Sequence, residues 1–388
     1  MRPSQEILRL PPLSLYIHIP WCIKKCPYCD FNSHAGKAEQ LPIEEYCKAL
    51  RQDLTEDAKW AQGRKIQSIF FGGGTPSLFP PAAIAEILSD VDHIVGIEEH
   101  AEITLEANPG TTEYTSFRAL RQAGVNRLSI GIQSFNPEHL QKLGRIHSAN
   151  EAETAIHRAQ EEGFDNINLD LMHGLPQQTV AMALDDLEKA MSFRPNHLSW
   201  YQLTIEKNTE FFSRPPSLPE EDILVDIFEA GQQALFQQGY QQYEISAYSK
   251  AGKMSAHNIN YWQFGDYLAI GAGAHGKITL DDQQQIMRFQ KTRLPQHYLD
   301  PARQFTAQQH ICDSENLVLE FMMNALRLND GVASELFQQR TGLALETILP
   351  TLQQLHAKGL LESPAQRIQP SALGRLYLNN LLESFVQN

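Results

Sequence analysis

Three cysteines lie within eight residues near the start of the chain, at Cys22, Cys26 and Cys29, in a Cys-x3-Cys-x2-Cys spacing. Thiolates this close together on a loop can bind one soft metal centre. A four-iron cluster takes four ligands, so three cysteines leave one iron open, like the vacant position of a catalytic zinc. The spacing therefore predicts a 4Fe-4S cluster with an exchangeable corner, where chemistry or a cofactor can act.

Other arrangements of metal ligands stay open at this stage. A zinc site could combine the three cysteines with His18 or His34. Cys47 could be a remote fourth ligand, but it lies in an apolar helical pattern, where a free cysteine usually behaves as a small buried hydrophobe. Cys312 stands just before a helix start expected at Ser314. We expect neither of these two cysteines to bind the cluster.

The cysteine motif follows the segment Tyr-Ile-His-Ile-Pro at residues 16–20. Together they resemble the radical S-adenosylmethionine (SAM) proteins, in the branch around oxygen-independent coproporphyrinogen III oxidase. The resemblance extends over about residues 10–380. It implies that the amino and carboxylate groups of SAM chelate the open iron. It also implies that Tyr28 packs near the adenine and that Tyr16 belongs to the same cofactor site.

The elements that must position this loop are strands alternating with helices. The runs expected to be strands are residues 13–19, 66–71, 101–107, 127–133, 166–172 and 198–205. Amphipathic helices are expected at 82–91, 112–122 and 149–162. Repeated strand–helix units imply parallel pairing with right-handed crossovers, and six units are fewer than the eight of a closed barrel. The prediction is an α/β fold with a partial (β/α)6 TIM-type barrel, which the resemblance also implies.

Functional groups of such barrels gather at the C-terminal ends of the strands. Polar or glycine residues fall at or soon after these ends at Gly73, Gly74, Thr75, Glu106, Gln133, Arg145 and Asp170. The glycine run lacks the lysine of a P-loop and the spacing of a dinucleotide fold. The resemblance implies that residues 73–75 contact the methionine part of SAM and that the other four also hold SAM, with Asp170 on the ribose hydroxyls. Charge-assisted hydrogen bonds of this kind orient a ligand firmly.

The chain divides into a leader at 1–12, the barrel at 13–210, an extension at 211–305 and a C-terminal domain at 306–388. In the extension we expect a helix at 220–238 and strands at 240–248 and 267–270. The last domain is predicted to be α-rich and winged-helix-like, with helices at 314–327, 333–341 and 345–358, a hairpin at 360–369 and a final helix from 370. Residues 310–388 hold eight acidic and five basic residues, which disfavours DNA binding.

The extension carries the motif His257-Asn258-x2-Tyr261-Trp262. Taken alone, it could be a packed loop. In context it resembles the motif of the heme chaperones within this branch. A neutral imidazole is a common axial ligand of heme iron, and aromatic rings offer flat apolar surface to a porphyrin. The resemblance implies that His257 binds the iron and that Tyr261 and Trp262 line the porphyrin, while His275, on a glycine-rich turn, is a second candidate.

Three functions compete. The oxidases of this branch carry a further cysteine two residues after the triplet, where this chain has Phe31. The resemblance therefore favours a heme chaperone that holds the cluster, SAM and heme and delivers heme to an acceptor protein. Oxidative decarboxylation of coproporphyrinogen III is the alternative, so that enzymatic activity is undecided. A radical methyltransferase of nucleic acid is disfavoured by the net charge of −14.

Location and partners follow from weaker signals. The sequence shows no signal-peptide pattern and no run of eighteen apolar residues, so no membrane segment is expected. Five cysteines with a tight cluster indicate a reducing compartment, which predicts a cytoplasmic protein. The acceptor implied by the resemblance is a respiratory or heme-storage hemoprotein, and a homodimer is compatible with it.

Overall fold

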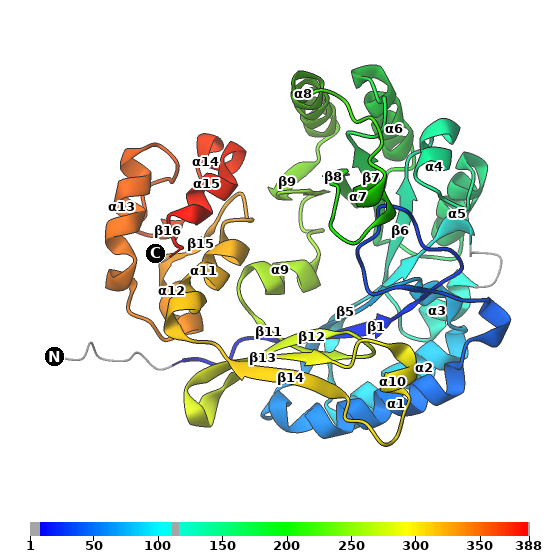
Figure 1. Ribbon diagram of the computed structural model, residues 1–388, viewed down its shortest axis with the longest axis horizontal. Coiled ribbons are helices and arrows are strands. Elements are labelled where there is room, and N and C mark those ends of the chain that lie inside the picture. Colours follow the sequence, from blue (N-terminus) through cyan, green and yellow to red (C-terminus); the bar gives the residue numbers. More distant parts are fainter. Residues whose placement is uncertain (1–7, 111–115, 387–388) are drawn as a thin grey trace.

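The computed structural model describes residues 8–110 and 116–386. Most of the expected leader at 1–12 therefore lies outside the described residues, as do residues 112–115 of the helix expected at 112–122. Within the described chain, twelve strands form one long sheet in the order β14-β13-β12-β11-β1-β4-β5-β6-β7-β8-β10-β9 (Figure 1). The middle of this sheet is the barrel, and its two margins come from the second half of the chain.

The six barrel strands are β1 (Leu13–Ile19), β4 (Ile66–Gly73), β5 (Ile97–Ala107), β6 (Arg127–Gln133), β7 (Ile167–His173) and β8 (His197–Gln202). Neighbouring strands of this set pair in parallel. The residues of β1, β6 and β7 are buried almost without interruption, as expected where helices cover one face and the barrel interior the other. The predicted partial (β/α)6 barrel is confirmed.

The helices of the barrel and its flank are α1 (Ile43–Asp57), α2 (Pro81–Ile94), α3 (Phe117–Gln122), α4 (Pro137–Lys142), α5 (Ala149–Glu161), α6 (Val180–Ser192), α7 (Glu210–Ser213) and α8 (Glu221–Gln237). The start of α5 illustrates their local control. Ser148 accepts a hydrogen bond from the backbone of Glu151, whose side chain accepts from the backbone of Ser148. This capping box satisfies two amides that have no partner inside the helix.

The extension completes the sheet on both margins. β9 (Gln241–Glu244) and β10 (Ala247–Ser249) form an antiparallel margin beside β8. The single strand predicted at 240–248 is therefore wrong: the chain reverses at residues 245–246, where the Ser246 amide donates to the Glu244 carboxylate. On the other margin, β11 (Asp266–Ile270) pairs in parallel with β1. The antiparallel strands β12 (His275–Leu280), β13 (Gln285–Lys291) and β14 (Thr306–Ile311) follow.

The C-terminal region has its own core, built around Phe321, Phe337 and Leu352. Its elements are α11 (Ser314–Ala325), β15 (Val332–Ala333), α12 (Ser334–Thr341), α13 (Leu349–Ala357), β16 (Arg367–Ile368), α14 (Ala372–Leu376) and α15 (Leu378–Glu383). The hairpin predicted at 360–369 is present as a short antiparallel bridge between Leu361 and Pro370, where the Glu362 amide donates to the Gln369 carbonyl at 3.0 Å. β16 also pairs with β15, a longer-range contact that was not predicted. The domain division at 305/306 stays a prediction, although β14, which follows it, belongs to the large sheet.

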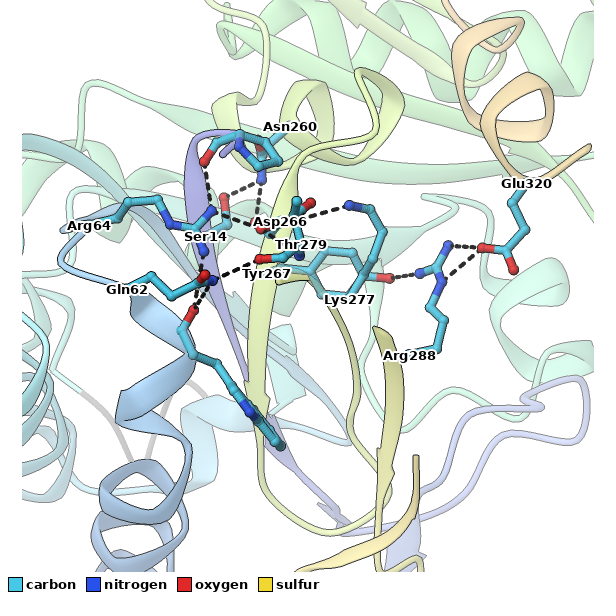
Figure 2. A network of polar contacts seen from close by, with 12 residues as sticks. Ser14, Gln62, Arg64, Asn260, Asp266, Tyr267, Lys277, Thr279, Arg288 and Glu320 are labelled. Atoms are coloured by element: carbon cyan, nitrogen blue, oxygen red, sulfur yellow. Dashed lines mark hydrogen bonds and ion pairs between the residues drawn. The ribbon is translucent and has the colours of Figure 1, made fainter. Parts of the chain in front are cut away.

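A buried charge network fastens the extension to the barrel (Figure 2). The Asp266 carboxylate on β11 accepts hydrogen bonds from Lys277 Nζ at 2.8 Å and Arg64 Nη1 at 2.7 Å, and also from both the amide and the hydroxyl of Thr279. Burial alone would raise the pKa of Asp266, but Lys277 and Arg64 outweigh burial and lower it. The buried carboxylate is thus compensated by two cations of the chain.

Candidate functional site

The cysteine loop lies at the C-terminal ends of the barrel strands. Cys22 is on the short strand β2 (Trp21–Cys22), which pairs with β3 (His34–Ala35) and so closes the loop between them. All three predicted cysteines line one cavity of about 500 Å³. The Thr75 hydroxyl lies 3.5 Å from the Cys22 sulfur, and Arg145 Nη1 lies 3.6 Å from the Cys26 sulfur. Donors of this kind stabilise thiolates, which are the ligand form for iron.

A single metal ion does not fit these groups. Across residues 8–110 and 116–386, no three histidine, cysteine or carboxylate side chains have the spacing to hold one ion. In a cubane each cysteine binds a different iron, so wider spacing is required. Both ring nitrogens of His18 are bonded, to the Tyr16 hydroxyl and the Asn32 carbonyl. Cys47 is buried on α1, as predicted. The three thiols thus share one cavity without forming a site for a single ion.

The same cavity collects most of the residues predicted to hold SAM. Its lining includes Tyr28, Gly73, Gly74, Thr75, Glu106, Gln133, Arg145 and Asp170, which come from the ends of four strands, the cysteine loop and the loop after α4. Tyr16 lies outside it, in a neighbouring cavity. The glycines are needed because the cysteine loop passes close by: a Cβ at Gly74 would collide with the Trp21 carbonyl, and one at Gly73 with the His18 ring. These glycines thus bring the loop directly onto the strand end.

The charges of this cavity are arranged in two opposed groups. Burial, and then the nearby Asp170, raise the pKa of Glu106 to about 8, although the Gly73 amide donates to it at 3.3 Å. Burial also raises the pKa of Asp170, against hydrogen bonds from Asn168 and Ser129. Arg145 supplies positive charge on the cysteine side. A ligand with a cationic sulfonium, an ammonium and a carboxylate matches such a site.

Gln133 occupies a strained position at the end of β6. Its backbone φ is +69°, which is uncommon for a residue other than glycine, and the pairing with β7 shifts register between Gly131 and Gln133. The side-chain oxygen accepts a 2.7 Å hydrogen bond from Tyr201. Strain of this sort concentrates where a side chain must be aimed at a ligand. Gln133 is therefore held toward the cavity by the fold and not only by a loop.

The histidine motif forms a helix, α9 (Ala256–Trp262), and not a loop. Ser255 caps its start by accepting from the Asn258 amide. The His257 side chain is only 1% exposed, and both ring nitrogens have partners: Nδ1 lies 3.1 Å from the Ser68 hydroxyl and Nε2 lies 2.8 Å from the Tyr261 hydroxyl. Burial lowers the pKa of His257 to about 3, so the ring is neutral.

The helix α9 contributes side chains to two cavities. Asn258 and Trp262, four residues apart on one face, line the cysteine-side cavity, while Tyr261 lines the neighbouring one of about 620 Å³. We call these the cofactor cavity and the second cavity. Phe31, Gly73 and Glu106 line both cavities, so the two are adjacent. In Figure 1, α9 lies between the C-terminal helices and the barrel strands.

Comparison with known proteins decides the family. The Radical SAM superfamily model matches residues 16–190, and the HemN C-terminal domain model matches residues 312–377. The chain is 50% identical over 382 residues to the heme chaperone HemW of Haemophilus influenzae, covering 97% of this chain and 99% of that protein. It is also 50% identical over 380 residues to HemW of Escherichia coli, covering 98% and 100%. The chain belongs to the HemW family.

The HemW family match agrees with the fold and with the cofactor cavity. A solved structure of coproporphyrinogen III oxidase (HemN) from Escherichia coli superposes with a TM-score of 0.80 at 24% identity, over 97% of this chain and 91% of that one, which shows a shared fold. Membership in the radical SAM superfamily implies a 4Fe-4S cluster and SAM. No helix in the described part of the chain is long and apolar enough to cross a bilayer.

Sequence reasoning missed much of the second cavity. Tyr267 and Arg293 line it, yet neither belongs to a motif. Phe31 stood out only as a departure from the oxidase pattern, and the structure places it at the junction of both cavities, 60% exposed. Trp262, predicted to line the porphyrin, lies on the cofactor side with Arg327 at 4.3 Å from its ring. Only the pairing of β11, β12 and β13 brings the missed residues together.

Proposed function

We propose that this chain is a heme chaperone, which binds heme beside a cluster carrying SAM and passes heme to an acceptor protein. One observation supports this above all: a cavity of about 620 Å³, lined by aromatic and histidine side chains, directly adjoins the cofactor cavity. Its volume lies within the range of about 300–1,000 Å³ that is typical for small-molecule sites. A HemW-like scaffold with room for a second ligand is what heme delivery requires.

The proposed cofactor site uses the residues of the first cavity. Cys22, Cys26 and Cys29 would hold three irons, and the bound cluster would supply one electron for reductive chemistry on SAM. Arg145 is placed to hold the thiolate side electropositive, since its guanidinium donates to Cys26 and to the Gly131 carbonyl at 2.6 Å. The aromatic ring of Tyr28, with Phe211 at 6.3 Å, offers a flat apolar surface for the adenine.

The remaining proposed contacts with SAM come from four strand ends, those of β4, β5, β6 and β7. Gly73, Gly74 and Thr75 would contact its methionine part, because the backbone there lies closest to the cysteine loop. Asp170 would accept from the ribose hydroxyls, and Glu106 would face positive charge. These roles, like that of Gln133, rest on the family pattern together with the shared cavity.

The proposed iron contact of His257 needs a change of conformation. In this structure the imidazole is enclosed, and its Nε2 is hydrogen-bonded to Tyr261. Ligation of heme iron through that nitrogen would therefore require the Tyr261 hydroxyl to move away. The assignment of His257 as ligand, with Tyr261 and Trp262 beside the porphyrin, stays a prediction.

The wider setting is also proposed. Free cysteines around a cluster suit a reducing compartment, so we place the protein in the cytoplasm. The proposed acceptor is a hemoprotein of respiration or heme storage, and the delivering form is proposed to be a homodimer. Phe31, in place of the additional cysteine of the oxidases, counts against oxidase activity.

Anaerobic reconstitution tests the proposed function. The purified chain is loaded with iron, sulfide and SAM, titrated with hemin, and then mixed with apomyoglobin as a heme acceptor. A Soret band on titration, followed by transfer to apomyoglobin, is expected. A variant with Cys22, Cys26 and Cys29 replaced by alanine is the matched control for the cluster. Absence of hemin binding, or formation of protoporphyrinogen from coproporphyrinogen, would overturn the chaperone assignment.

A further inference from the structure

The floor of the second cavity is one face of the strands β11 to β13. His275 pairs with Gln290 across β12 and β13, and both line the cavity together with Tyr267 on β11. The residues between them, such as Phe289 and Ile278, point to the opposite face and are buried in the main core. Alternation along a strand thus gives the cavity a broad sheet surface on one side. A planar ligand can lie against such a surface.

His275 differs from the other histidines around this cavity. The rings of His18 and His257 each have both nitrogens hydrogen-bonded inside the chain. His275 is exposed, and within residues 8–110 and 116–386 no group hydrogen-bonds to its ring. Partial burial, and then Arg288, lower the pKa of His275, which keeps the ring neutral. A neutral imidazole with free nitrogens in an aromatic cavity is a ready ligand for iron.

The rim of the cavity offers a counterpart for carboxylates. Arg293 is exposed, and no carboxylate in the described residues forms an ion pair with it; its Nε lies 3.3 Å from the Asn32 side-chain oxygen. A guanidinium binds a carboxylate strongly because two parallel hydrogen bonds form. The exposed ring of Phe31 and the ring of Tyr261 add apolar surface to the same cavity.

We propose that heme binds in the second cavity, with a ring nitrogen of His275 on the iron and Arg293 paired with a propionate carboxylate. The assignment rests on the proposed heme-chaperone function and deepens it, because it names the iron contact and the carboxylate contact. It differs from the His257 prediction. In this assignment His257 does not touch the iron, and its ring stays enclosed, hydrogen-bonded to Ser68 and Tyr261.

The first test compares three single variants of the full reconstituted chain, His275→Ala, His257→Ala and His100→Ala. His100 is an exposed histidine near the start of β5, at the end of that strand away from Glu106, and serves as the matched control. Hemin affinity is expected to fall about tenfold or more in His275→Ala, a loss near 1.4 kcal/mol. The iron–histidine stretching band in the resonance Raman spectrum of the ferrous heme complex should disappear in this variant and return on addition of imidazole. His100→Ala should bind like the parent.

The second test addresses the carboxylate contact with hemin dimethyl ester, which lacks the propionate charges. The parent chain should bind the ester several-fold more weakly than hemin, and Arg293→Gln should bind the two alike. If Arg293→Gln still distinguishes the two porphyrins as the parent does, the propionate contact is wrong. The cluster absorption with SAM, unchanged in every variant, shows that the fold is retained.

Failure of the inference and failure of the proposed function give different results. If the parent chain binds no hemin, the chaperone function itself is rejected. If the parent binds hemin and His275→Ala binds equally, with its iron–histidine band intact, the iron contact at His275 is rejected and the function stands. Loss of that band in His257→Ala alone would assign the iron to His257.

Discussion

Two buried carboxylates of this protein have opposite surroundings. Asp266, in the network that joins the extension to the barrel, contacts Lys277 and Arg64 and has a lowered pKa (Figure 2). Glu106, between the two cavities, has the Gly73 amide as its donor and Asp170 nearby, and its pKa is raised to about 8. The carboxylate that stabilises the fold is paired with cations of the chain. The carboxyl group at the site has no such cation beside it, so a positively charged ligand can supply one.

A third site lies between these extremes. Lys291, fully buried, is shared by Asp53 and Asp57 at 2.6 Å each. One cation serves two carboxyl groups, so burial raises the pKa of Asp57 to about 7 despite Lys291. The direction of the pKa shift of a buried carboxyl group therefore depends on the number of cations beside it and not on burial alone.

The largest expected effect comes from removing the matched carboxylate. Asp266→Asn keeps the shape but leaves Lys277 and Arg64 without a negative partner. Breaking a buried ion pair on one side costs about 3–5 kcal/mol of folding free energy. We expect a loss of this size in urea unfolding followed by circular dichroism.

The control for this variant is Asp282→Asn, an exposed carboxylate in the turn between β12 and β13. It should change stability by less than about 0.5 kcal/mol, as surface substitutions do. If Asp266→Asn lost no more than this control, the network would not be the fastening between extension and barrel.

The matched network also marks the limit of sequence reading. β1 was predicted at residues 13–19 and found there, because a local run of β-branched and apolar residues defines a buried strand. The contacts of Asp266 with Arg64 and Lys277 span up to 202 positions and depend on β11 pairing in parallel with β1. No local pattern contains that pairing. The barrel strand could therefore be predicted from the sequence, whereas the Asp266 network that joins the extension to the barrel could not.

The same limit applies within the site. Cys22, Glu106 and Asp170 could be predicted because strand ends of a barrel meet at one edge. The helix α9 was missed although Ser255, three residues before Asn258, is a capping signal. The second cavity was missed because His275 and Arg293 meet only through antiparallel pairing of β12 and β13. Contacts that arise from strand pairing cannot be predicted from the sequence around either residue.

The unmatched carboxylate should give the next largest effect. Glu106→Gln removes a negative charge that the proposed SAM cation would meet, and a hydrogen bond to a charged group is worth about 1.5–3 kcal/mol. We expect SAM affinity, measured by calorimetry on the reconstituted chain, to fall roughly 10–100-fold. Stability without SAM should not fall, unlike in Asp266→Asn.

An exposed glutamate provides the control for this variant. Glu138→Gln, on α4, should leave SAM affinity unchanged. A drop in stability of Glu106→Gln without SAM, similar to that of Asp266→Asn, would show that Glu106 is structural, and the comparison between the two regions would fail.

A pH titration of stability sharpens the comparison further. The pKa of Glu106 is about 8 in the folded chain and near 4.3 when unfolded, so the folded state holds one more proton between these values. The free energy of unfolding must then decrease as pH rises through this window, by at most about 1.4 kcal/mol per pH unit from this group. Glu106→Gln should flatten the slope in the SAM-free chain. An unchanged slope would mean that Glu106 is ionised in the folded state.

The smallest expected effect on stability comes from a variant that tests whether α9 serves the fold or the ligand site. Tyr261→Phe removes the hydroxyl that pairs with His257 Nε2, and a buried hydrogen bond contributes about 1 kcal/mol. We expect the free energy of unfolding, measured by urea denaturation, to fall by about this amount. The reason is that α9 is held by hydrogen bonds within the chain, such as that of Asn260 to Ser14 at 2.9 Å.

The same variant discriminates between the two candidate iron ligands. Tyr261→Phe frees Nε2 of His257 without opening the cavity to solvent. If His257 is the heme ligand, freeing its nitrogen should raise hemin affinity, because the Tyr261 bond no longer competes with iron. If His275 is the ligand, hemin affinity should stay within about twofold of the parent. The substitution keeps the aromatic ring at position 261 and leaves the His275 imidazole unchanged in the second cavity. An increase of about tenfold in hemin affinity would therefore show that α9 is part of the heme site and does not serve only to stabilise the fold.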